Sequence, residues 1–91
     1  MFTLHYTGAF TKDIKRIKKR AYNTQLLSEA IFFLESDGSV PTKFKPHKLS
    51  GNYSDCWECH IKSDWLLIWR KDEIQKEIQL VRTGTHSDLF R

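Results

Sequence analysis

The fold of this chain is decided by residues 57–69, which read Trp57-Glu58-Cys59-His60-Ile61-Lys62-Ser63-Asp64-Trp65-Leu66-Leu67-Ile68-Trp69. Residues 57–61 alternate, which is typical of a strand, and residues 65–69 are almost all apolar, which predicts a central strand covered on both faces. The stretch from His60 to Trp65 is therefore interpreted as the tight turn of a hairpin. A hairpin end is rigid enough to hold His60 and Asp64 close together.

A last strand is predicted downstream, where residues 78–83 again alternate. Arg82 shares the parity of Ile78 and Leu80, so we expect its charge to lie at the rim of the sheet, in a cleft. A turn at Gly84 would let His86 reach a group held by Arg82. The apolar residues 89 and 90 are expected to tie the C-terminus down.

An opening strand is predicted over residues 2–6, with Phe2, Leu4 and Tyr6 on one face and His5 on the solvent face. Two amphipathic helices should follow. The first has an apolar face at intervals of four, three and four residues (Phe10, Ile14, Ile17, Ala21). The second starts at a cap, Asn23 or Thr24, and stops at Gly38. The short connection predicts an antiparallel helical hairpin.

The polar side of the first helix is basic and carries Lys12, Lys15, Arg16, Lys18, Lys19 and Arg20. Such a run either grips phosphates or is simply a solvated helix face, and the sequence leaves both interpretations open.

Residues 38–52 contain two prolines and two glycines without a sustained period, which predicts a long ordered loop. Loops of this length in compact domains are often functional. Leu49 can anchor this loop in the core and so hold the neighbouring His47 at the surface.

Residues 56–60 match the C-x-x-C-H pattern of covalent haem attachment. Along a strand, however, positions three apart point to opposite faces, so Cys56 and Cys59 would not reach one porphyrin edge or one zinc ion. We interpret Cys59 as a small core residue and place Cys56, Glu58 and His60 on the opposite face.

The 91 residues are expected to form one domain, residues 1–91, with a single core. A net charge of +4 and a pI near 9.2 give a mild bias towards polyanions such as RNA. No apolar run approaches the roughly 20 residues of a membrane span and no signal peptide precedes the first strand, so we expect a cytoplasmic protein with reduced thiols and no membrane partner.

Three motifs carry a resemblance to a known family. They are His47-x-Leu49-x-Gly51, His60-Ile61-x-x-Asp64-Trp65-x-Leu67-Ile68 and Arg82-Thr83-Gly84-Thr85-His86-x-x-Leu89-Phe90. In this order and spacing they resemble the YafQ branch of the RelE/ParE superfamily of bacterial toxins, over nearly the whole chain. The resemblance implies an α+β fold of the RelE type, in which an N-terminal strand, a helical hairpin and a three-stranded antiparallel meander complete one twisted sheet.

The resemblance also implies a function. It implies that the chain is a type II toxin, an endoribonuclease that cuts mRNA in the ribosomal A site without a metal or cofactor. The active site would comprise His47, His60, Asp64, Trp65, Arg82, His86 and Phe90. Candidate substrate-binding residues are Trp65, Phe90, Lys12, Lys15, Arg16 and Lys19. The expected partners are the ribosome, mRNA and a cognate antitoxin, with DNA contacted only through the antitoxin complex.

The chemistry of these side chains agrees with that implication. RNA is cleaved without metal when a base deprotonates the 2′-hydroxyl, a cation neutralises the phosphorane and an acid protonates the departing 5′-oxygen. Histidine suits either proton transfer, and the forked donors of Arg82 suit a phosphate. Asp64 could be the base or could orient a histidine. Trp65 and Phe90 offer flat faces for stacking. His86 is the most plausible acid, and which histidine is the base stays open.

The alternative from another functional class is a non-catalytic toxin of the ParE type that binds DNA gyrase. A binder of that kind has no need of three histidines around one arginine.

Overall fold

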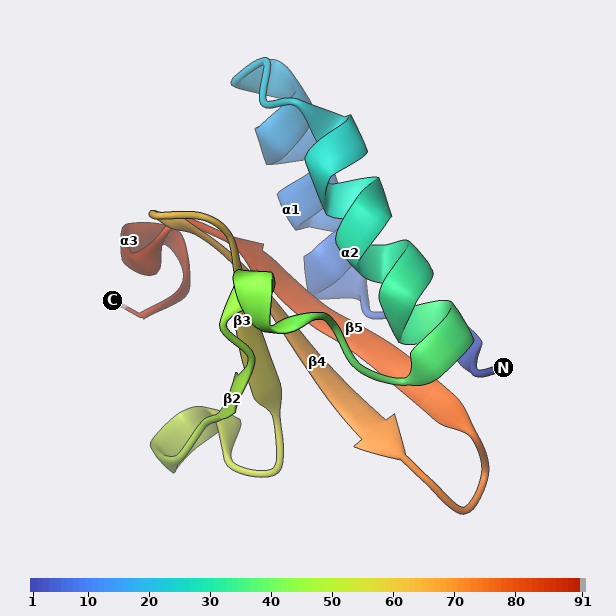
Figure 1. Ribbon diagram of the computed structural model, residues 1–91. Coiled ribbons are helices and arrows are strands. Elements are labelled where there is room, and N and C mark those ends of the chain that lie inside the picture. The colour runs from blue at the N-terminus through green and yellow to red at the C-terminus, as the bar shows by residue number, and fades with distance from the viewer. Residues whose placement is uncertain (91) are drawn as a thin grey trace.

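The computed structural model describes residues 1–90 and contains a five-stranded sheet in the order β1-β5-β4-β3-β2, with the helices α1 and α2 side by side over one face (Figure 1). The elements are β1 (Thr3–Tyr6), α1 (Gly8–Lys19), α2 (Thr24–Asp37), β2 (His47–Lys48), β3 (Trp57–Lys62), β4 (Trp65–Asp72), β5 (Glu77–Gly84) and α3 (His86–Leu89). Two one-turn 3₁₀ helices, η1 (Thr42–Phe44) and η2 (Gly51–Tyr53), flank β2.

The predicted α+β class and element order are confirmed. β1 pairs in parallel with β5, and β3, β4 and β5 form the antiparallel meander. The loop predicted for residues 38–52 is wrong in one respect, because His47 and Lys48 form the short strand β2, in which His47 pairs with Glu58 of β3. A two-residue strand has no period from which a sequence pattern could predict it.

The central strand β4 is covered on both faces, as predicted, and Trp65 to Trp69 are each at most 3% exposed. Its residues alternate between two apolar clusters. The main cluster lies under the helices and contains Phe2, Phe10, Ile17, Leu27, Ala30, Leu34, Val40, Phe44, Cys59, Trp65, Leu67, Trp69, Ile78 and Leu80. The second cluster lies on the other face and contains Cys56, Leu66, Ile68 and Leu89, with Leu49, Tyr53 and Val81 packed against it. Leu49 therefore anchors its loop as expected.

Local signals set most helix ends. The side chain of Thr7 caps α1 and that of Asn23 caps α2, and Gly38 ends α2 in the left-handed conformation at φ 76°. A Cβ on Gly38 would overlap the Phe2 ring, so this position requires glycine twice over. The prediction for Ala21 is wrong: α1 stops at Lys19, and Ala21 is exposed with φ 59°.

The prediction that Arg82 shares the face of Ile78 and Leu80 is also wrong. A β-bulge shifts the β4–β5 register, so that Trp69 pairs with Leu80 whereas Ile68 pairs with Arg82. The extra residue turns Arg82 to the face of the second cluster. That face carries the site described below.

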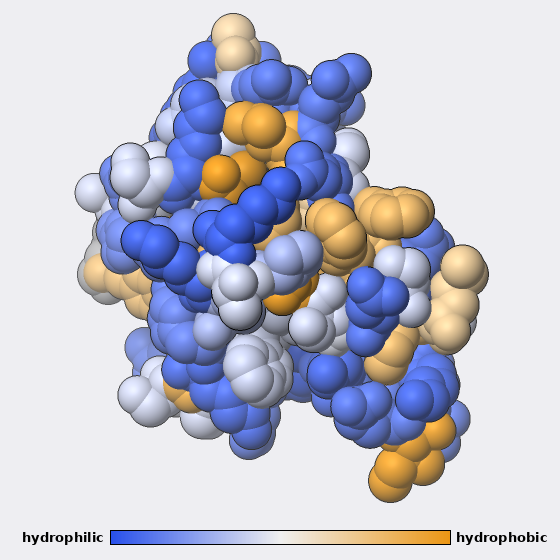
Figure 2. Space-filling view, viewed as in Figure 1, coloured by the Kyte–Doolittle hydropathy of each residue, from blue (hydrophilic) through white to orange (hydrophobic). Residues whose placement is uncertain are grey.

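Figure 2 shows a largely hydrophilic surface on which apolar residues appear in patches. Ile74, in the turn between β4 and β5, is 90% exposed. Within residues 1–90 no helix has the length and hydropathy required to span a membrane.

Candidate active site

Three histidines predicted for the site come together on the second face of the sheet. The ring centroids of His47 and His60 lie 6.2 Å apart, and those of His60 and His86 lie 6.4 Å apart. We call His47, His60 and His86 the histidine row. It is built from β2, β3 and α3, three elements that are far apart in the sequence, and Phe90 continues it at 6.1 Å from His86.

Asp64, in the β3–β4 turn, fixes the last histidine of the row. Its Oδ1 accepts the His86 backbone N–H at 3.0 Å and lies 2.7 Å from His86 Nδ1. These hydrogen bonds from the His86 backbone and ring lower the pKa of Asp64 from its ordinary value. Nδ1–H donates to the carboxylate, so Nε2 is the nitrogen that stays available to substrate. Nε2 carries the lone pair when the ring is neutral and the second proton when the ring is an imidazolium. The geometry therefore fits an orienting role for Asp64.

The short helix α3 is tied to the body of the protein by Asp88. Thr85 and Asp88 form a capping box, and Arg20 at the end of α1 donates to both oxygens of Asp88 at 2.7 and 3.0 Å. The hydrogen bonds from Arg20 hold the pKa of Asp88 well below its usual range. Leu89 is buried in the second cluster and ties down the C-terminus as predicted, whereas Phe90, for which the same was predicted, is 44% exposed.

Arg82 is held by Asp13, a residue that the sequence patterns did not single out. Asp13 is 1% exposed, and its oxygens accept from Arg82 Nε at 2.7 Å and Nη2 at 3.0 Å. It also accepts from the backbone of Thr83 and from Arg16, each at 3.0 Å. The hydrogen bonds to Asp13 raise the pKa of Arg82. One edge of the guanidinium is therefore occupied, and the edge formed by Nη1 and Nη2 is left for a phosphate.

A helical signal could have revealed Asp13. It lies three residues after Phe10 and four before Ile17, both of which are buried. An acidic residue on the apolar face of a basic helix requires a cationic partner inside the fold.

Glu58 is a second acidic residue that the predicted site omitted. It faces His47 across the β2–β3 pair, is 4% exposed, and its Oε1 lies 3.1 Å from His47 Nε2. His47 Nδ1 lies 3.2 Å from the backbone oxygen of Lys45. The alternation of residues along β3 predicted that Glu58 shares a face with His60, and this prediction is confirmed. That alternation was the sequence signal by which Glu58 could have been included in the site.

Trp65 is not available for base stacking, which corrects the prediction. It is 3% exposed, its indole N–H donates to Thr83 Oγ1 at 2.9 Å, and its ring packs edge-on against Tyr22. Phe90, by contrast, is 44% exposed. The ring of Tyr53 meets Phe90 edge-on at 5.6 Å, and its hydroxyl lies 3.5 Å from Arg82 Nη1. Tyr53 thus links the arginine to the row.

The basic residues of α1 fall into different environments. Arg16 reaches Asp13 and so lies beside Arg82, whereas Lys12 and Lys19 are exposed. Lys15 lies on the opposite side, with Lys18, in an apolar groove of about 530 Å³ between α1 and α2. The groove is lined by Tyr6, Phe10, Thr11, Ile14, Lys15, Lys18, Thr24, Leu27, Ser28 and Ile31.

The two cysteines are free and lie on opposite faces of the sheet, as the parity argument predicted. Cys59 belongs to the main cluster and Cys56 to the second, and both are fully buried. Burial raises the pKa of the Cys59 thiol to about 12. Neither cysteine therefore contributes to the histidine row.

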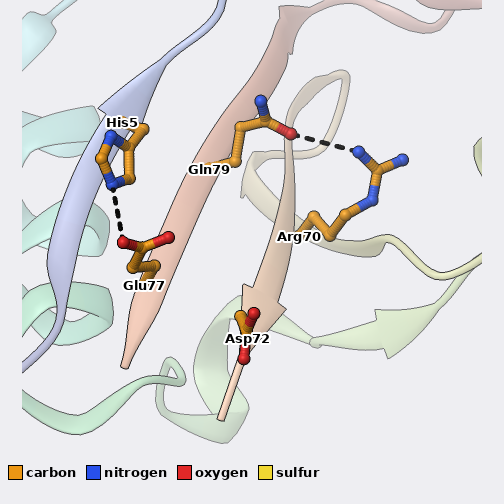
Figure 3. Close-up of a pocket in the computed structure, with 5 residues that line it drawn as sticks. All are labelled: His5, Arg70, Asp72, Glu77 and Gln79. Carbon is orange, nitrogen blue, oxygen red and sulfur yellow. Dashed lines mark hydrogen bonds and ion pairs between the residues drawn. The ribbon is translucent and has the colours of Figure 1, made fainter. Parts of the chain in front are cut away.

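Two hollows lie in the surface, one beside the site and one away from it. One of about 460 Å³ adjoins the site and is lined by Ala21, Tyr22, Asn23, Lys62, Ser63, Asp64, Trp65 and Thr85. Another of about 340 Å³ lies at the other end of β4 and β5, where His5 contacts Glu77 at 3.6 Å and Arg70 donates to Gln79 at 3.1 Å (Figure 3). His5 is exposed, as predicted, and is paired at the surface away from the row.

Sequence comparison finds relatives over nearly the whole chain. A family model described as the bacterial toxin of type II toxin-antitoxin systems, YafQ, matches residues 2–91. The mRNA interferase toxin YafQ of Escherichia coli K12 is 31% identical over 88 residues, which cover 96% of this chain and 94% of the relative.

Solved structures agree with the sequence comparison. The Escherichia coli DinJ-YafQ complex contains a chain that matches with a TM-score of 0.90 and 29% identity over 100% of both chains. A metal-bound toxin from Helicobacter pylori matches with a TM-score of 0.89 and 34% identity over 99% of this chain and 100% of that one.

Proposed function

This chain belongs to the YafQ family of type II toxin-antitoxin toxins, and on that basis we propose that it is an endoribonuclease that cuts mRNA in the ribosomal A site. The observation that carries the proposal is the His86–Asp64 pair, at 2.7 Å, in a row with two further histidines. The name of the Escherichia coli relative, an mRNA interferase, supports the same class of reaction. The protein's own side chains supply the acid, the base and the cation that the reaction needs.

His86 is the general acid of this mechanism. Asp64 fixes the tautomer by accepting from Nδ1, so Nε2 of the imidazolium is the atom that delivers a proton to the departing 5′-oxygen. The exposed position of His86 and its place on the terminal helix suit a group that must meet a large substrate.

His60 is the general base, because the base and acid of an in-line displacement must lie on opposite sides of the phosphorus. Its ring lies 6.4 Å from that of His86, a separation that leaves room for a phosphate between the two. His47 and Glu58 lie beside His60, on β2 and β3, and support this end of the histidine row.

Arg82 neutralises the phosphorane. Asp13 fixes one edge of its guanidinium, so the free Nη1 and Nη2 edge meets the phosphate in a defined direction. The contact between Arg82 and Tyr53, and that between Tyr53 and Phe90, bring the arginine alongside the row.

RNA is held by stacking and by charge. Phe90 is the exposed ring on which a base stacks. Arg16, Lys12 and Lys19 extend the cation surface from Arg82 along α1 and meet the backbones of mRNA and ribosomal RNA.

A cognate antitoxin silences the toxin. The Escherichia coli relative has been solved in complex with DinJ, and we propose an equivalent partner for this chain. The groove between α1 and α2 is apolar with Lys15 and Lys18 among its lining residues, which suits an acidic amphipathic segment that folds on binding. The complex should weaken as salt is raised.

Mapping of transcript ends during induction tests the function against its alternative. Cleavage within translated codons supports the ribonuclease. Intact messages together with gyrase-dependent DNA breaks would support the ParE-like gyrase binder instead.

A further inference from the structure

Tyr53 lies beside Arg82 with a hydroxyl proton that the mechanism above does not use. Its oxygen is 3.5 Å from Arg82 Nη1. A guanidinium carries donors only, so the phenolic oxygen is the acceptor in this contact. The O–H of Tyr53 therefore remains free to donate elsewhere, and residues 1–90 offer it no acceptor.

The ring of Tyr53 is held on several sides, which gives its hydroxyl a fixed position. The residue ends the 3₁₀ helix η2, and its ring packs against the second cluster. Its backbone oxygen accepts the Cys56 N–H at 3.0 Å, and the ring of Phe90 meets it edge-on at 5.6 Å. A donor whose position is set before the substrate arrives costs little reorganisation at the moment of reaction.

The contacts of Arg82 bring a bound phosphate to the same place. Asp13 occupies Nε and one side of Nη2, so a phosphate that uses the remaining edge must approach Nη1, the nitrogen that Tyr53 faces. Phe90 contacts the rings of both Tyr53 and His86, so a base stacked on Phe90 keeps its phosphate near these two residues. At 3.5 Å the Tyr53–Arg82 contact is long for a hydrogen bond, and such contacts often tighten only when substrate binds.

We propose that Tyr53 is a further catalytic residue, whose hydroxyl donates to a non-bridging oxygen of the scissile phosphate beside Arg82. The assignment rests on the proposed ribonuclease function. Tyr53 transfers no proton itself. The 2′-hydroxyl proton passes to His60 as the 2′-oxygen bonds to phosphorus, and the bond from phosphorus to the 5′-oxygen breaks as His86 protonates that oxygen. The Tyr53 hydroxyl stabilises the negative charge that the phosphorane oxygens carry between these two events.

Tyr53→Phe tests the assignment, because it removes the hydroxyl and keeps the ring that contacts Phe90. Cleavage of mRNA on programmed ribosomes under single-turnover conditions should be roughly 10²-fold slower than with wild type, the range for losing one preorganised donor. The toxin concentration that gives half the maximal rate, and the melting temperature, should both stay near wild type. A near wild-type maximal rate for Tyr53→Phe would overturn the assignment.

Phosphorothioate mRNA separates a contact with the phosphate from a purely structural role. Sulfur accepts hydrogen bonds weakly, so sulfur at the non-bridging position that Tyr53 contacts should slow wild-type cleavage more than sulfur at the other position. This difference between the two diastereomers should shrink in Tyr53→Phe, which has no hydroxyl to donate. A difference of the same size in wild type and variant would show that the hydroxyl does not touch the phosphate, and would overturn the proposal.

Tyr22→Phe is the matched control, since it removes the same group from a ring that packs against Trp65. Its maximal rate and its preference between the diastereomers should equal those of wild type, and a loss as large as that of Tyr53→Phe would contradict the assignment. A wild-type toxin that leaves mRNA on the ribosome intact would refute the proposed function and this assignment together. An active wild type with an equally active Tyr53→Phe would refute the assignment alone.

Discussion

Nδ1 of His86 lies 2.7 Å from Oδ1 of Asp64, and the same oxygen accepts the His86 backbone N–H at 3.0 Å. One carboxylate oxygen in the β3–β4 turn thus fixes both the backbone and the ring of the residue that starts α3. The pair joins the second and third of the three motifs that resemble the YafQ branch. It also decides which ring nitrogen faces the substrate.

Replacement of Asp64 by Asn should lower the cleavage rate by roughly 10²-fold, because the amide no longer fixes the tautomer of His86 as strongly. His86 lowers the pKa of Asp64, so the carboxylate is fully charged above the ordinary pKa of 3.8. Its negative charge is lost only when the pH falls through the lowered pKa. The deficit of Asp64→Asn should therefore be constant between about pH 8 and pH 5. A deficit that changes within this window would contradict a lowered pKa for Asp64 and the pairing with His86 that lowers it.

Loss of Asp13 should destabilise the fold strongly. Asp13→Ala leaves Arg82 without its partner and the Thr83 N–H unpaired, which should lower the free energy of unfolding by about 3 kcal/mol. Urea denaturation measures the change. Glu29→Ala, which removes the exposed Lys43–Glu29 pair, is the control and should cost less than about 1 kcal/mol. Equal losses in the two variants would contradict the role given to Asp13.

Trp65 and Phe90 should behave oppositely. Trp65→Phe removes the indole N–H that donates to Thr83, so it should reduce stability by about 1–3 kcal/mol and leave RNA binding near wild type. Phe90→Ala should leave the melting temperature nearly unchanged and weaken binding of an RNA oligonucleotide roughly tenfold. Weaker RNA binding by a folded Trp65→Phe variant would return Trp65 to the substrate site.

The Arg20–Asp88 pair should make stability depend on pH. The folded-state pKa of Asp88 is depressed by Arg20, so its contribution is present above the ordinary value of 3.8 and is lost as the pH falls through the folded value. Asp88→Asn should therefore melt at a lower temperature than wild type at neutral pH, and the difference between the two melting temperatures should shrink only as the pH falls below 3.8 towards the depressed value. Glu29→Gln is the control. It also removes a surface charge, but its difference in melting temperature from wild type should not shrink in this way.

Much of the fold was predictable because it follows from periodic patterns. The run from Trp65 to Trp69, the cap at Asn23 or Thr24 and the stop at Gly38 all act over a few neighbouring residues, and the structure confirms the run and the stop and selects Asn23 as the cap. The face of Arg82 was not predictable in this way. A β-bulge adds one residue to a strand without a sequence signal, and it reverses every parity argument beyond it.

The histidines of the site were predicted from the sequence, whereas two acidic residues, Asp13 and Glu58, were missed. His47, His60 and His86 were found through motifs that resemble a family, and the structure brings them into one row. Asp13 acts through Arg82 on β5 and Glu58 acts through His47 on β2, and only the tertiary fold brings these partners together. Trp65 was misjudged because an aromatic ring beside a turn has the same sequence signature whether it stacks on RNA or fills the core.

The most direct test of the account is the chemistry of the ends left by ribosome-bound cleavage, measured for wild type, His86→Gln and His86→Ala. Attack by the 2′-hydroxyl predicts a 2′,3′-cyclic phosphate and a 5′-hydroxyl from wild type. Both variants should form these ends roughly 10² to 10⁴-fold more slowly, because neither an amide nor a methyl group can protonate the departing oxygen. Products with 3′-hydroxyl and 5′-phosphate ends, or near wild-type rates for His86→Gln, would contradict the account.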